Sequence, residues 1–190
     1  MGKFLYWMNV SLDLRIEQVP GDNGAGEWLH IDDKVHAEFN ARAKALAGMV
    51  QGRVMYEIMD PFWPDARDDE SHPAVIREYG HIWTDSPKWL VSRTRTEADH
   101  NTRIVSDLAA LEKLRSESDG TIGVGGASIA TQLLRAGLLD ELLLFTHPSY
   151  LGAGRPLFDD YEWPIDLELL EQKAFTNGVT MHHYAIRELS

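Results

Sequence analysis

The chain has 190 residues, 44% of them hydrophobic and 25% charged, which is typical of a soluble globular protein with a single domain over 1–190. Its formal net charge of −12 argues against nucleic acid or an anionic membrane as partner, because either would require a basic face. The absence of cysteine excludes a disulfide framework and a thiolate metal site. The apolar run at 4–8 is too short for a signal-peptide core and no run approaches ~20 residues, so we take the protein as cytoplasmic.

Apolar runs of strand length alternate with helical patterns through most of the chain. Residues 4–10 predict a strand buried on both faces, and the glycine-containing stretch 14–30 predicts a loop. Asp32 or Asp33 can cap a helix that ends at Gly48. Further strands are predicted at 49–51, 89–92, 103–105, 121–124 and 142–145. Further helices are predicted at 54–59, weakly at 74–81, after Asp107 and after Ser128, whereas 60–73 predicts a loop.

The C-terminal tail predicts a β-hairpin, because two extended segments, 167–175 and 179–187, flank Asn177-Gly178. Strands that alternate with helices and end in a hairpin predict an α/β fold. Its sheet is mostly parallel with helices on both faces and an antiparallel edge. Ligands of such sheets bind beyond the carboxyl ends of the strands.

A glycine turn at residues 123–128 is the most informative motif. The run 121–124 predicts a strand that turns through Gly125 and Gly126 directly into a helix. Such a turn presents free backbone N–H groups and the positive end of a helix dipole, a favourable place for phosphate. The alternative is a tight turn without a ligand. The motif is neither a P-loop, which needs Gly-Lys-Ser/Thr, nor a dinucleotide fingerprint, which needs glycine where Ser128 stands.

Three predicted strand ends carry chemistry that suits a phosphorylated ligand. Arginine matches phosphate bidentately and hydroxyl groups add donors. Each arginine alone is more typical of a solvated surface, but the three groups together indicate a cofactor with several phosphates. They are Gly52-Arg53, Ser92-Arg93-Thr94 and Gly125-Gly126-Ala127-Ser128.

In this order and spacing the motifs make the chain resemble the dihydrofolate reductase-like family, in particular stand-alone relatives of the reductase domain of riboflavin biosynthesis. The resemblance covers nearly the whole chain. It includes Ser11-Leu12-Asp13, the stretches 52–57 and 91–94, the glycine turn at 125–128, the stretch 136–141, His147-Pro148, Leu151-Gly152 and Pro156-Leu157-Phe158.

The resemblance implies a three-layer α/β/α fold and NADPH as cofactor. It implies that Gly52, Arg53, Ser92, Arg93 and Thr94 hold the adenosine-side phosphates. The glycine turn (Gly125, Gly126, Ala127 and Ser128) would then lie against the pyrophosphate and near the nicotinamide. Relatives often pair, which suggests a homodimer. The combined zinc-deaminase signature, H-x-E with P-C-x-x-C, is missing, so this is not the bifunctional riboflavin enzyme.

Two positions depart from the family pattern. Leu14 stands where relatives usually have glycine, and we expect it to reshape the substrate side. Met55 stands where many relatives have threonine, which removes one phosphate donor. Neither departure removes the cofactor site.

The substrate side has two candidate carboxylates. Trp28 and Asp33 have the spacing at which folate reductases hold a ring and favour its protonation, so Asp33 is a candidate to bind and protonate a heterocycle. Helix capping is the alternative. Asp13 follows the first strand and is the second candidate. Trp28, Phe62 and Trp63 can stack on a flat ring, or pack as ordinary core or loop residues.

The histidines offer weaker chemistry. His147 ends a predicted strand and precedes Pro148, so we interpret it as a structural corner rather than a proton shuttle. His182 and His183 point to opposite faces of a strand, and we expect no metal site.

The sequence therefore predicts an NADPH-dependent reductase that transfers hydride to a C=N or C=O group of a small pterin-like, flavin-precursor or related substrate. The alternative is a non-catalytic protein that binds a nucleotide or heterocycle on the same fold, an interpretation that the Leu14 departure motivates.

Overall fold

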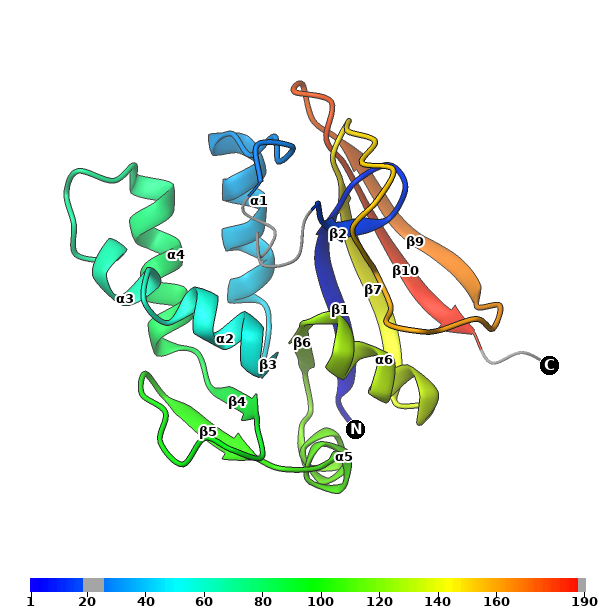
Figure 1. Ribbon diagram of the computed structural model, residues 1–190. Helices are drawn as coiled ribbons and strands as arrows, with labels where there is room; N and C mark the ends of the chain where they lie inside the picture. Colours follow the sequence, from blue (N-terminus) through cyan, green and yellow to red (C-terminus); the bar gives the residue numbers. More distant parts are fainter. Residues whose placement is uncertain (19–25, 188–190) are drawn as a thin grey trace.

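Eight strands form one sheet (Figure 1) in the computed structural model, which describes residues 1–18 and 26–187. Their order across the sheet is β5 (Thr102–Val105), β4 (Lys88–Val91), β3 (Gly48–Gly52), β6 (Thr121–Gly125), β1 (Lys3–Val10), β7 (Leu139–Thr146), β10 (Thr180–Arg187) and β9 (Asp166–Ala174).

The six strands from β5 to β7 run parallel, and β10 and β9 add an antiparallel edge. This confirms the predicted mostly parallel sheet with a C-terminal hairpin. The hairpin turn uses the predicted pair: Gly178 has φ 88°, and the Asn177 side chain accepts a hydrogen bond from the Val179 N–H at 3.2 Å. A positive φ at this position favours glycine.

Helices cover both faces of the sheet, which confirms the three-layer α/β/α fold (Figure 1). On one face α1 (Asp33–Lys44) and α4 (Ala74–Asp85) lie side by side, and on the other lie α5 (Leu108–Glu117) and α6 (Ala127–Arg135). Successive side chains of a strand point alternately into the two helical layers. Tyr6 packs in the α5–α6 core, whereas Leu5 packs against α1. This alternation is the period-two geometry of a sheet buried on both faces.

The structure differs from the sequence-based expectation at three short elements. A four-residue helix, α3 (Trp63–Ala66), lies inside the predicted loop 60–73 and follows α2 (Arg53–Met59). The Trp63 ring packs on Tyr79 of α4 with centroids 4.5 Å apart, a tertiary contact that no local pattern announces. The strand β2 (Arg15–Glu17) lies inside the predicted loop 14–30, where it pairs with β8 (Arg155–Pro156).

The helix predicted at 74–81 is longer than its sequence pattern suggests and ends at Asp85. Lys88, which is buried at the start of β4, donates hydrogen bonds to the carbonyl oxygens of Trp83 and Ser86. These carbonyls lack partners within the helix, so a buried ammonium group stabilises the last turn.

His147 is a structural corner that ties β7 and β1 to the segment before α1. Its ring is fully buried, and its Nδ1 accepts a hydrogen bond from the His30 N–H at 2.9 Å. The proton must therefore sit on Nε2, which donates to Asn9 Oδ1 at 3.1 Å. Burial, with a smaller contribution from the charge of His30, lowers the pKa of His147 from 6.5 to about 4. The imidazole is neutral in the folded protein and places Trp28 and His30 beside the end of β1.

The lowered pKa of His147 predicts acid sensitivity below pH 6.5. Below pH 6.5 the His147 ring becomes protonated in the unfolded chain, whereas in the folded protein it stays neutral down to about pH 4. The free energy of unfolding therefore falls as the pH is lowered through this range. At pH 7.5, His147→Asn should lower it by about 1–3 kcal/mol through lost buried hydrogen bonds. At pH 5.5 the deficit should shrink by about 1 kcal/mol, because the wild type alone bears the proton penalty.

Urea unfolding followed by tryptophan fluorescence at both pH values measures this difference. The exposed His81 provides the control, since His81→Asn should change stability equally at both pH values. A His147→Asn deficit of the same size at pH 7.5 and 5.5 would contradict the neutral-ring assignment.

Candidate functional site

The three predicted phosphate-binding segments come together because β4, β3 and β6 are neighbours in the sheet. Gly52 lies opposite Val91, and Gln51 lies opposite Gly125. All three strands are parallel, so their carboxyl ends meet at one edge. The structure therefore places Gly52-Arg53, Ser92-Arg93-Thr94 and the turn 125–128 beside one another.

Gly126 shapes the turn between β6 and α6. It has φ 112° and ψ 128°, a conformation that side-chain-bearing residues rarely adopt, and a Cβ there would lie 3.8 Å from the Gly52 Cα. Gly126 caps α6 without any side-chain hydrogen bond. The first N–H groups of this nine-residue helix are left to other acceptors, and the helix dipole favours an anion there.

Three arginines surround this strand edge, and one of them was not predicted. Arg53 pairs with Glu57 at 2.7 Å, and Arg95 approaches the same carboxylate at 3.7 Å while its guanidinium lies over the Tyr56 ring. Arg93 is exposed, and within the described residues it makes no hydrogen bond or ion pair. The sequence does contain a signal for Arg95, because this arginine stands two residues after Arg93 in the same basic segment.

Ser92 has a different role from a direct ligand. It is buried, and its Oγ accepts hydrogen bonds from the N–H groups of Thr94 at 3.3 Å and Arg95 at 3.1 Å. Such a serine turn fixes the path of the chain after β4. It thereby presents Arg93 and Thr94, which are both exposed, at the edge of the sheet.

A cavity of about 650 Å³ opens beside the glycine turn and runs between α1, α2 and α4. Of the predicted site residues, Trp28, Asp33, Gly125, Gly126 and Ala127 line it. The others lie outside its wall: Asp13, Gly52, Arg53, Ser92, Arg93, Thr94 and Ser128. The predicted site thus divides into a cavity and a basic strand edge that meet at the glycine turn.

The structure separates the two acids at the start of α1. Asp32 is the N-cap, and its Oδ1 accepts hydrogen bonds from the N–H groups of Lys34 at 3.1 Å and Val35 at 2.9 Å. Asp33 is the first helical residue and lines the cavity. Its carboxylate makes no hydrogen bond or ion pair with any described residue. Capping therefore leaves Asp33 available to a ligand.

Asp13 holds a loop. Its carboxylate accepts hydrogen bonds from the Leu151 N–H at 3.0 Å, the Gly152 N–H at 2.9 Å and the Ser11 hydroxyl at 2.7 Å. The Leu151 bond is the main contribution that lowers the pKa of Asp13 to about 2, and the Ser11 and Gly152 bonds add to it. All these donors stabilise the anion, so Asp13 acts as an anchor for residues 149–152.

The two departures from the family pattern have local explanations. Leu14 has φ 56°, the left-handed region that glycine adopts more easily, and it is not among the residues that line the cavity. The exchange therefore changes a turn rather than the cavity wall. Met55 lies on the glycine turn, since a Cβ added to Gly125 would approach its Cγ to 3.1 Å. Its thioether replaces a hydroxyl donor with an apolar surface.

The aromatic and polar lining of the cavity was partly missed by sequence reasoning. His36, Trp63 and Tyr79 all line it, although 36, 63 and 79 lie on three different helices. Of the three predicted stacking residues, Trp28 and Trp63 line the cavity, whereas Phe62 is exposed and its ring packs on Trp63. The sequence pattern predicts only that Gln51 belongs to a strand. In the structure its side chain is buried and lines the cavity.

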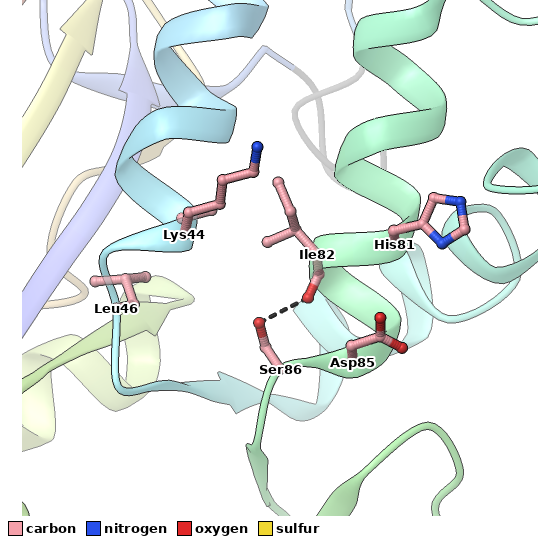
Figure 2. A pocket seen from close by; sticks show the side chains of 7 residues that line it. Lys44, Leu46, His81, Ile82, Asp85 and Ser86 are labelled. Atoms are coloured by element: carbon pink, nitrogen blue, oxygen red, sulfur yellow. Dashed lines mark hydrogen bonds between the residues drawn. The ribbon is translucent and has the colours of Figure 1, made fainter.

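A second hollow, of about 330 Å³, lies between the ends of α1 and α4 (Figure 2). Two of its polar side chains are already paired: Ser86 donates to the Ile82 carbonyl at 2.6 Å, and Lys44 pairs with Glu78. Figure 2 shows the Lys44 and His81 side chains spread apart rather than converging on one point. This hollow has no arrangement of groups suited to chemistry.

Residues 1–18 and 26–187 contain neither a membrane-spanning helix nor a metal-binding cluster. No helix there combines the length and apolar character needed to cross a bilayer. In the same residues, no three histidine or carboxylate side chains are grouped so as to hold a metal ion. His183 instead bonds Glu141 at 2.8 Å, and His182 stacks on Tyr184.

Comparison with solved structures finds the same fold in three other bacterial proteins. A riboflavin biosynthesis protein from Shewanella sp. PV-4 matches with a TM-score of 0.72 and 19% identity, covering 98% of this chain and 99% of that one. Acinetobacter baumannii RibD matches at 0.67 and 15%, over 98% of this chain and 58% of the other. A pyrimidine reductase-like protein from Corynebacterium diphtheriae matches at 0.63 and 14%, over 98% and 92%. These likenesses concern the fold.

Sequence comparison gives the family. Protein YyaP of Bacillus subtilis (strain 168) is 30% identical over 178 residues, 92% of this chain and 90% of that protein. Protein YwjB of the same strain is 24% identical over 189 residues, 95% and 97% of the two chains. The family model for the RibD C-terminal domain matches residues 5–181. The chain therefore belongs to the RibD C-terminal domain family and has the dihydrofolate reductase-like fold.

Proposed function

We propose that this protein is an NADPH-dependent reductase acting on a small ring compound. The observation that carries the proposal is the uncapped glycine turn at Gly126, which lies between a basic strand edge and a cavity. A phosphate at the turn would meet free N–H groups and the positive end of α6. The cavity on its other side has room for a ring. Membership of a reductase family supports the same conclusion.

The residues at the strand edge fit the cofactor. Arg53, Arg93 and Arg95 would hold its adenosine-side phosphates, and their number favours the extra 2′-phosphate of NADPH over NADH. The approach at Gly126 is open, because a Cβ there would have its nearest heavy atom at 3.8 Å, and that atom is the Gly52 backbone. NADPH, when bound, would supply the hydride.

The protein's own contribution would be to orient the substrate and supply a proton. Asp33 is suited to this because it lines the cavity while Asp32 does the capping. A carboxylate there can bind a ring nitrogen and favour its protonation, directly or through water. Asp13 is fully engaged by the loop that it anchors, which leaves Asp33 as the candidate proton carrier.

We also propose that the protein acts as a homodimer in the cytoplasm. The edge strand β9 is exposed along its whole length, and Leu167, Leu169 and Leu170 present apolar side chains on it. Trp163, which is also exposed, precedes the strand in the chain. An exposed edge strand with apolar side chains favours pairing with another copy.

The cofactor assignment predicts a selective thermal shift. NADPH should raise the melting temperature more than NADH, because a ligand that binds only the folded state stabilises it. Arg93→Ala should abolish the difference between the two cofactors, since it removes an unpaired arginine from the strand edge. Arg187→Ala is the control: this arginine pairs with Glu168 at the far side of the sheet and should leave both shifts unchanged. No shift with NADPH at millimolar concentration would refute the proposed function.

The different roles of Asp32 and Asp33 predict that one substitution lowers stability and the other lowers activity. Asp32→Ala should lower the free energy of unfolding by about 1 kcal/mol, because it removes a helix cap. Asp33→Asn should leave stability nearly unchanged but slow NADPH oxidation by about 100-fold or more, the usual contribution of a positioned acid. The rate is measured against a panel of pterins, flavin precursors and ketones. An undiminished rate in Asp33→Asn would contradict its role, and NADPH binding without any turnover would support the non-catalytic alternative.

The exposed strand predicts a dimer that a single charge disrupts. Light scattering after gel filtration should give twice the chain mass for the wild type and the chain mass for Leu169→Glu, because a buried carboxylate opposes association. Leu12→Glu is the control, since Leu12 is also exposed but lies outside β9. A monomeric wild type would contradict this part of the proposal.

A further inference from the structure

Charge divides the site into two ends of opposite character. Arg53, Arg93 and Arg95 lie at the strand edge, outside the cavity wall. Among the described residues that line the cavity, the charged ones are Glu17, Asp32, Asp33 and Arg155. The Arg155 guanidinium donates two hydrogen bonds to the Asp159 carboxylate, at 2.7 and 3.0 Å, and pairs with the Glu17 carboxylate at 3.7 Å. A phosphate or carboxylate inside the cavity would meet net negative charge.

The wall of the cavity between α1, α3 and α4 is built from rings. The His36 ring lies 5.7 Å from Phe39, 6.0 Å from Trp63 and 5.7 Å from Tyr79, measured between ring centroids. Four of the six methionines of the chain line the same cavity: Met8, Met49, Met55 and Met59. Aromatic faces and flexible thioethers favour flat, weakly polar ligands of adaptable outline.

Three residues that line the cavity have a buried polar atom without a hydrogen-bond partner among the described residues. These atoms are the Gln51 Oε1, the His36 Nδ1 and the Trp28 Nε1. Their side chains are at least nine-tenths buried, with exposed fractions of 4%, 6% and 6%, and all three line the cavity. Burying an unpaired donor or acceptor is costly, so native proteins usually provide a partner. A ligand with donors and acceptors on its edge would supply it.

We infer that the cavity takes an uncharged, planar ring compound that carries no phosphate, stacks within the aromatic wall and hydrogen-bonds His36 and Gln51. This inference rests on the proposed function, in which that ring is the substrate and the cofactor phosphates stay at the strand edge. It sets this chain apart from any enzyme whose substrate carries its own phosphate into the cavity.

A matched pair of probes tests the inference. Lumiflavin and flavin mononucleotide share one fluorescent ring system, and only the second carries a ribityl phosphate. Their dissociation constants are measured by fluorescence titration of the wild-type protein and of His36→Phe, and only binding that His36→Phe weakens is counted. Lumiflavin should bind at least tenfold more tightly than flavin mononucleotide. His36→Phe should weaken lumiflavin binding about three- to tenfold, the effect of one lost hydrogen bond.

Further variants keep the test decisive. Gln51→Met removes the unpaired oxygen at similar volume and should also weaken lumiflavin binding about threefold or more. His182→Phe is the control, because His182 lies on β10 outside the cavity wall and should leave binding unchanged. The NADPH thermal shift of every variant is recorded in parallel and reports on cofactor binding.

Two kinds of failure are then distinguishable. His36-dependent binding of flavin mononucleotide as tight as that of lumiflavin would overturn the inference, as would the absence of His36-dependent lumiflavin binding. A missing NADPH shift beside intact lumiflavin binding would instead refute the proposed reductase and leave the inference about the cavity standing.

Discussion

Parallel pairing of β3 with β4 on one side and β6 on the other is the constraint on which the candidate site depends. Gly52 stands opposite Val91, and Gln51 opposite Gly125, so three turns separated by many residues end at one edge. The backbone at Gly126 then leaves that edge with a φ of 112° and opens α6 without a side-chain cap. A register shift of one residue would turn the Gln51 side chain to the opposite face of the sheet.

The strand edge and the cavity differ in the kind of side chain that they present. Arginines gather where phosphates would lie, whereas acids, rings and thioethers line the cavity on the other side of the glycine turn. Between the two stands a helix N-terminus whose dipole favours anions. A cofactor that is charged at one end and carries a ring at the other matches this division, and a charged substrate does not.

Other ionisable groups stabilise the scaffold through the hydrogen bonds that they make within the protein. Burial keeps the His147 ring neutral, and two hydrogen bonds hold it in place. The Asp13 carboxylate is held ionised by the N–H donors of one loop. The position of Asp13 after the first strand made it a candidate for chemistry, whereas the sequence already indicated a structural corner at His147. Asp33, which lacks such partners in the described residues, is the acid that the fold leaves free for a ligand.

The sequence by itself determined the features that depend on neighbouring residues. The glycine turn at 125–126, the hairpin at Asn177-Gly178 and the alternation of strands with helices follow from backbone freedom and local periodicity. The family resemblance came from the order and spacing of the motifs between residues 11 and 158. Only the tertiary structure decided which acid caps α1, where Arg95 lies and how His36, Trp63 and Tyr79 form one wall. Those outcomes depend on packing between elements distant in the chain, and packing leaves no local pattern in the sequence.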